Sequence, residues 1–176
     1  TSFKHSRNKA ASGFHWHQKT NVENREEMVG SSGLDQFKGA GIMVFERVYS
    51  PRIEDVEMCV LLFRDRITGE YSEGGGRRDS GETYAAETAC RELQEESCNL
   101  LTLTPDVVQR CEYVAQKSYV CFACHVHGIQ PATFDQNHLK IASSSPSCWK
   151  EKDRLTYVPV ESVRTCNVRP GAVTLC

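Results

Sequence analysis

Three glutamates close together in the chain are the residues best suited to chemistry. Glu92, Glu95 and Glu96 lie in RELQEE, within a stretch whose apolar residues recur at helical spacing. Residues three and four positions apart share one helix face, so the three carboxylates project together. Carboxylates this close repel one another unless a cation neutralises them, and hard divalent ions prefer oxygen ligands. The spacing therefore predicts a site for Mg²⁺ or Mn²⁺ that could orient a diphosphate and activate water.

A charge run usually marks only a solvated acidic helix face, and that interpretation stays open. The neighbourhood favours the metal site, because a glycine run at 74–76 and an acid at Glu82 come shortly before the helix. Glycines allow close backbone approach to a ligand. Further candidates are weaker and come from the loops. For phosphate or substrate binding they are Gly75, Arg77, Arg78 and Lys150, and for an extra metal ligand or base they are Glu112 and Glu151.

The segment Gly76–Leu100, GRRDSGETYAAETACRELQEESCNL, resembles the Nudix box, whose pattern is G-x5-E-x7-R-E-U-x-E-E-x-G-U, with U a bulky apolar residue. The resemblance implies a phosphoanhydride hydrolase with an α/β/α sandwich fold around a mixed sheet. It assigns catalysis and metal binding to Glu92, Glu95 and Glu96. It assigns supporting roles to Gly76 and to a salt bridge between Glu82 and Arg91.

Two departures from the pattern are visible. Eight residues, not seven, separate Glu82 from Arg91, so we expect the extra residue to be absorbed where the loop meets the helix. The final glycine of the pattern is replaced by Cys98, followed by Asn99. Glycine usually ends such a helix in the left-handed conformation, which asparagine also adopts. We therefore expect the helix end to shift to Asn99.

The remaining pattern predicts an α+β fold with one domain over residues 38–165. Residues 1–37 read as an irregular arm and residues 166–176 as a tail. We expect the helix at 84–97, capped by Ser80 or Thr83, and a long surface loop at 128–148. A short helix should begin at 161–165. Strands are predicted at 39–47, 56–64, 107–115, 118–126 and 155–160.

The chain has 176 residues with a net charge of −2, which argues against a strongly basic nucleic-acid footprint. No apolar run is long enough to span a bilayer, so no membrane partner is expected. The nine cysteines allow either a secreted protein with disulfides or an intracellular one with buried thiols. We favour secretion, with action inside a host cell as one form of it. A disulfide is then expected among Cys111, Cys121, Cys148, Cys166 and Cys176, with Cys90 a buried thiol.

A second cysteine pattern, Cys121-Phe-Ala-Cys124-His125, matches the haem attachment spacing and offers zinc ligands. It lies in an alternating run typical of a strand, where residues three apart point to opposite faces. We therefore favour a plain strand.

The preferred function is hydrolysis of a nucleotide-type substrate: the 5′ cap of messenger RNA (decapping) or a dinucleoside polyphosphate. Some members of the family act on diphosphoinositol polyphosphates, and secreted plant-pathogen effectors carry the same box. Aromatic residues able to stack on a base are Tyr71, Tyr113, Tyr119 and Trp149. The alternatives are a diphosphoinositol polyphosphate phosphohydrolase, or a binding module or effector in which catalysis is incidental.

Overall fold

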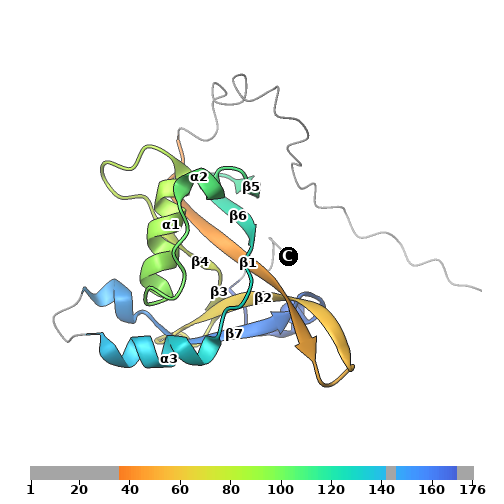
Figure 1. Cartoon of the computed structure of the whole chain (residues 1–176). Helices are drawn as coiled ribbons and strands as arrows, with labels where there is room; N and C mark the ends of the chain where they lie inside the picture. Colours follow the sequence, from red (N-terminus) through yellow and green to blue (C-terminus); the bar gives the residue numbers. More distant parts are fainter. Residues whose placement is uncertain (1–35, 142–145, 170–176) are drawn as a thin grey trace, which may run out of the picture.

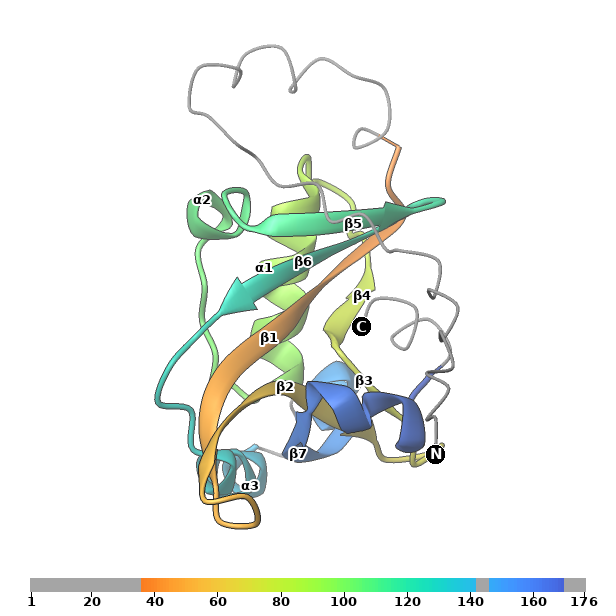
Figure 2. The same cartoon turned by 90° about the vertical axis from the view of Figure 1, so that its right-hand side faces the viewer.

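A seven-stranded mixed sheet forms the framework of the protein (Figure 1). The computed structural model describes residues 36–141 and 146–169. The long strand β1 (Gly39–Ser50) is central, and Figure 2 shows it crossing the sheet. It pairs antiparallel with β2 (Asp55–Asp65) and β4 (Gly74–Arg77), and parallel with β6 (Tyr119–His125). The outer strands are β3 (Tyr71–Ser72), β5 (Glu112–Gln116) and β7 (Lys152–Pro159).

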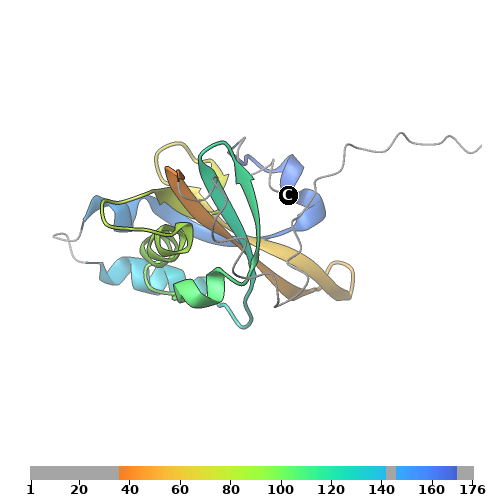
Figure 3. The ribbon, with the colours of Figure 1, turned by 90° about the horizontal axis from the view of Figure 1, so that it is seen from above.

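Helices flank both faces of this sheet. On one face a core that includes Ile42, Phe63 and Phe122 packs under the helices. A smaller cluster around Met43 and Val163 fills the opposite face, and Figure 3 shows the two sides. The predicted α+β sandwich with a mixed sheet is therefore confirmed. The helices are α1 (Ala85–Glu96), α2 (Pro105–Val108), α3 (Pro131–Lys140) and the 3-10 turns η2 (Ser147–Lys150) and η3 (Val160–Thr165).

Helix α1 forms where the sequence predicts it, but with different ends. The Glu87 carboxylate accepts the backbone N–H groups of Thr83 and Tyr84, at 2.6 and 2.9 Å, and so caps the first turn. The predicted cap at Ser80 or Thr83 is therefore wrong. At the other end Cys98 itself is left-handed (φ 54°), and Asn99 follows in the same conformation (φ 60°). The backbone thus keeps the turn that glycine favours, and the helix end has not moved.

Two short helices occupy segments predicted otherwise. Residues 107–110, expected to begin a strand, belong to α2 and the turn after it. Residues 128–148, expected to be a loop, contain α3, whose Phe134 is completely buried. Each helix has proline in its first turn, where the fixed φ angle of proline suits a helix and no N–H bond is lost. Pro131 lies inside the segment predicted as a loop, and Pro105 lies just before the predicted strand.

The other predicted segments agree more closely with the structure. Strands predicted at 39–47, 56–64, 118–126 and 155–160 correspond to β1, β2, β6 and β7, and η3 covers the predicted short helix. The described residues include no helix long and apolar enough to cross a membrane. Most of the predicted arm at 1–37, and the tail from residue 170, lie outside the described residues.

The strand interpretation of the Cys121–His125 motif is confirmed. Cys121 belongs to the cluster on the η3 side of the sheet, and Cys124 to the core on the helix side. Two thiols on opposite faces cannot attach one haem or ligate one zinc ion. Within residues 36–141 and 146–169, no disulfide is formed between described side chains. The side chains of Cys148 and Cys176 lie outside the description, so the expected disulfide stays a prediction.

Leu93 is the main anchor of α1 on the sheet, since its side chain is fully buried and lies against the β4 backbone at Gly74. We predict that Leu93→Ala lowers the free energy of unfolding by about 2–5 kcal/mol, because it leaves a cavity under the helix. Urea denaturation followed by circular dichroism measures this. The exposed Leu139, changed to Ala, is the control and should shift stability by no more than about 0.5 kcal/mol. An equal loss in both variants would contradict the anchoring role.

Candidate metal and phosphate site

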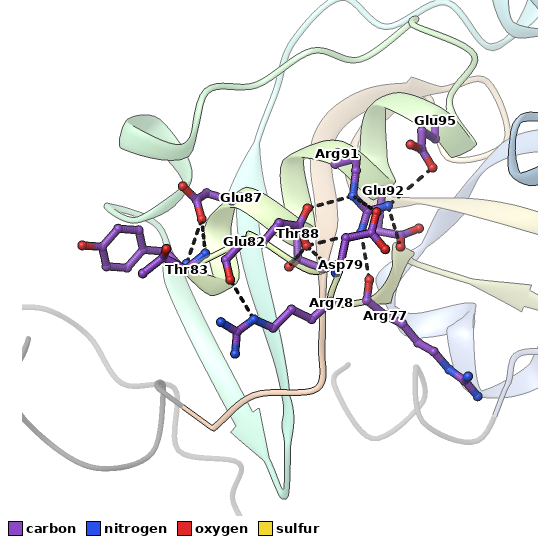
Figure 4. A network of polar contacts seen from close by, with 11 residues as sticks. Arg77, Arg78, Asp79, Glu82, Thr83, Glu87, Thr88, Arg91, Glu92 and Glu95 are labelled. Atoms are coloured by element: carbon purple, nitrogen blue, oxygen red, sulfur yellow. Dashed lines mark hydrogen bonds and ion pairs between the residues drawn. The ribbon is translucent and has the colours of Figure 1, made fainter. Parts of the chain in front are cut away.

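Arg91 joins three segments of the site (Figure 4). Its Nε donates to Glu82 Oε1 in the preceding loop at 2.8 Å, and its second amino group to the Arg77 carbonyl of β4 at 2.8 Å. Burial disfavours charge on both partners, yet their hydrogen bond lowers the pKa of Glu82 and raises that of Arg91. The Glu82–Arg91 contact therefore forms despite the extra residue. Helix α1 runs unbroken from Ala85 to Glu96, so Glu82 reaches Arg91 from the loop before the helix.

Glu92 lies between Arg91 and the glycine strand. Arg91 donates to its Oε1 at 3.0 Å. A side chain at Gly76 would collide with this carboxylate, so glycine there leaves the space that Glu92 occupies. Burial raises the pKa of Glu92, and the charges of Glu95 and Glu151 raise it further, against the opposing effect of Arg91. A cation at this point would relieve the repulsion.

Glu96, at the last turn of the helix, forms a buried ion pair with Lys152. Its Oε1 lies 3.1 Å from the Lys152 Nζ, and its Oε2 accepts the Gly75 N–H at 2.9 Å. Lys152 also donates to the Ser72 hydroxyl at 3.2 Å and is itself buried. Burial raises the pKa of Glu96 to about 8, although Lys152 and Gly75 act to lower it. Ser72 was not singled out from the sequence, and Lys152 was not expected to pair with Glu96.

The donor set of the three glutamates fits a hard divalent cation. They supply carboxylate oxygens from one helix face, and the space over Gly76 accepts the Glu92 carboxylate. Their side chains are turned to two different cations: Glu92 and Glu95 lie 3.0 and 3.5 Å from Arg91, and Glu96 pairs with Lys152. In the part of the chain that the structure describes, no three His, Cys, Asp or Glu side chains converge on one point. Metal binding would therefore exchange these ion pairs for metal–oxygen bonds.

A cavity of about 680 Å³ opens beside the glycine strand. Tyr119 forms one wall: its ring lies over Gly39, and its hydroxyl donates to Glu73 at 2.9 Å. Gly75 lines the same space and has no room for a side chain, because a Cβ there would meet the Tyr119 hydroxyl. Three cations, Lys38, Arg77 and Arg169, also line it. The cavity therefore offers positive charge and an aromatic wall on the Tyr119 side of the glycine strand, whereas Glu92 lies on its α1 side, at Gly76.

Only some of the other candidates for phosphate binding or metal ligation lie near the cavity. Gly75, Gly76 and Arg77 lie at the cavity, and Glu151 is close enough to influence Glu92. Arg78 instead stacks its guanidinium 4.6 Å from the centre of the Phe37 ring. Lys150 is in η2, which packs on α1, and Glu112 is exposed on the outermost strand, β5, across β1 from β4.

The aromatic candidates divide in the same way. Tyr119 lines the cavity, whereas Tyr113 packs against Phe122 on the helix side of the sheet, 6.1 Å between ring centres. Tyr113 therefore does not line this cavity, and its stacking role stays a prediction. Tyr71 contributes to the cluster on the η3 side, and Trp149 lies in η2 beside α1.

Comparisons with known proteins give structural matches only. The chain matches no family model and no curated protein. A Nudix hydrolase from M. smegmatis is 17% identical with a TM-score of 0.46, over 78% of this chain and 79% of that one. An Ap4A hydrolase from C. elegans is 13% identical with a TM-score of 0.49, over 79% and 91%. The Nudix domain of Shewanella oneidensis NrtR, solved with ADP ribose, is 16% identical with a TM-score of 0.46, over 85% of this chain and 92% of that one. At these values the likenesses decide neither family nor activity.

The Lys152–Glu96 pair gives a test of the site that does not depend on turnover. We predict that Lys152→Met lowers the free energy of unfolding by about 3–5 kcal/mol, because Glu96 is left buried without its partner. The double variant Lys152→Met/Glu96→Gln should recover most of the loss. Urea unfolding in EDTA measures all three proteins without a contribution from metal binding. Lys150→Met is the matched control, and a single variant no less stable than this control would refute the pairing.

Proposed function

We propose that this protein is a metal-dependent hydrolase of the Nudix type that cleaves a phosphoanhydride bond in a nucleotide-type substrate. One observation carries the proposal. The Glu82–Arg91 bridge fixes the loop to the helix that bears Glu92, Glu95 and Glu96, directly beside the glycine strand. These are the residues that the box resemblance pairs and assigns to the metal.

Different residues of the site would take different roles in the reaction. Glu92, Glu95 and Glu96 would hold Mg²⁺ or Mn²⁺, which when bound supplies charge neutralisation of the diphosphate and a more acidic water. Arg91 would hold the Glu92 and Glu95 carboxylates in place before substrate arrives, and Lys152 would hold Glu96. Lys38 and Arg77 line the cavity and would bind phosphate oxygens. Glu92 or Glu95 would accept the proton of the attacking water.

For the substrate we favour the 5′ cap of messenger RNA or a dinucleoside polyphosphate. The Tyr119 ring offers a face for a base, although its hydroxyl is engaged by Glu73. The Glu73 carboxylate also lines the cavity and opposes a densely anionic ligand. A diphosphoinositol polyphosphate is the runner-up, and Lys38, Arg77 and Arg169 would then be its cations. Arg169 lies 3.7 Å from Asp65, which already offsets part of its charge.

Glu95 gives the sharpest test of catalysis, because its ion pair with Arg91, at 3.5 Å, is the longest ion pair that the three helix glutamates form. We predict that Glu95→Gln reduces turnover by about 10²–10⁴-fold, the usual contribution of a positioned acid or base. The melting temperature should hardly change. Nucleotide release from capped RNA or diadenosine polyphosphate, with Mg²⁺ or Mn²⁺, measures the rate.

The matched control is Glu112→Gln, an exposed carboxylate at the start of β5 that does not itself line the cavity. It should retain the rate of the unmodified protein. Equal rates for the Glu95 variant and the unmodified protein would remove Glu95 from the reaction. No metal-dependent product from any substrate would favour a binding module instead.

The choice of substrate is tested with the same enzyme preparation. We predict release of 7-methyl-GDP from capped RNA, or of nucleotides from a dinucleoside polyphosphate, faster than phosphate release from a diphosphoinositol polyphosphate. Ion-pair chromatography at equal enzyme concentration follows both products. Arg77→Gln should slow whichever substrate is used, because its phosphates lose a cation. Cleavage of the inositol compound alone would reverse the order.

A further inference from the structure

Two cysteines on neighbouring strands bring their sulfur atoms together. Cys111 comes directly before β5, and Cys124 is in β6. Glu112 pairs with Ala123, so the antiparallel register carried back by one residue sets Cys111 opposite Cys124. Residues directly opposite in such a pair have Cβ atoms about 4.5–5.5 Å apart, near the spacing that a disulfide needs. The two sulfurs are 2.9 Å apart, with the Cys124 thiol donating to Cys111.

The two thiols differ in exposure. Cys124 is buried in the core on the helix side, whereas Cys111 packs against that core and remains half-exposed. An attacking or oxidising molecule can therefore reach Cys111 first. A third thiol, Cys90 of α1, lies in the same core and influences the pKa values of this region.

The hydrogen bond between the sulfurs favours a thiolate at Cys111. Accepting the Cys124 S–H lowers the pKa of Cys111 to about 7, although burial opposes this. The same bond and burial raise the pKa of Cys124. Near neutral pH the pair therefore combines a nucleophilic thiolate with a protonated neighbour, which is the arrangement that thiol–disulfide exchange requires.

We propose that Cys111 and Cys124 form a reversible intramolecular disulfide by exchange with a small-molecule disulfide such as oxidised glutathione. The Cys111 thiolate attacks one sulfur of that molecule, a mixed disulfide forms, and one glutathione thiolate leaves and is protonated. The Cys124 sulfur then attacks Cys111, and the second glutathione leaves with the Cys124 proton. Counted from the dithiol, the protein loses two electrons and two protons: the Cys111 proton goes to solvent, which protonates the first glutathione thiolate, and the Cys124 proton goes to the second.

The bond would join the turn after α2 to β6, beside Cys90 on the helix that carries the glutamates. It closes a short loop that contains the whole β5–β6 turn, so it restricts the unfolded chain and stabilises the folded one. The inference concerns the scaffold and does not depend on the proposed hydrolase activity.

The experiment uses the complete chain, reduced and then equilibrated in buffers of defined glutathione ratio. Free thiols are blocked, and the protein is digested with trypsin without reduction. We expect a mass loss of two hydrogens and a link between peptides 111–117 and 118–140. The melting temperature of the oxidised form should be higher by about 5–10 °C. Both changes should reverse on reduction.

Peptide 118–140 holds both Cys121 and Cys124, so two variants identify the partner. Cys121→Ser removes the thiol on the opposite face and should leave the link and the temperature shift unchanged. Cys111→Ser, at a half-exposed position, should abolish both. A link to Cys90 or to any other cysteine would overturn the proposal. Alkylation of Cys111 in the oxidised chain would also overturn it. A disulfide link between the same two peptides in the Cys111→Ser variant would do so as well.

Discussion

The hydrogen bonds of Arg91 are the interaction on which the candidate site depends. A half-buried guanidinium must satisfy its donors, and here they reach the loop at Glu82, the β4 backbone at Arg77 and Glu92 on its own helix. The loop, the strand and the helix are therefore fixed relative to one another by a single side chain. The glycine at position 76 is required by the same arrangement, because the Glu92 carboxylate occupies the space beside it. Loss of Glu82 would remove the shortest of the ion pairs that Arg91 forms and leave the guanidinium to Asp79, Glu92 and Glu95.

The sequence predicted the elements that depend on local pattern. Helix α1 has its apolar residues at helical spacing, and the glutamates follow from that spacing. The Lys152–Glu96 pair could not be predicted, since it joins residues far apart in the chain and only the β2–β7 register brings β7 to this edge. Nothing in KDRLTYV distinguishes the buried lysine from a solvated one. The cavity could not be predicted either, because Tyr119 contacts the glycines only through the parallel β1–β6 pairing.

The errors also have physical causes. Helices α2 and α3 were missed because each is short and begins with proline, which sequence patterns associate with loops as much as with first turns. Phe134 shows what was overlooked, since a single buried aromatic side chain holds α3 in place within an otherwise polar segment. At Cys98 the tertiary structure overrides residue preference. The turn after α1 is kept although the side chain is not glycine, and packing of Cys98 in the core compensates for the strain.

The parallel pairing of β1 with β6 has a consequence for how the chain reaches this structure. The β1–β2 and β5–β6 hairpins pair neighbouring segments and can form early, because little loop entropy opposes them. Gly39 instead pairs with Tyr119 across a long segment that contains the glycine strand and α1. Such distant contacts slow folding. The cavity wall is therefore completed in a late folding step, so a nascent or partly unfolded chain could carry the glutamate helix without yet having a surface on which to seat a ligand.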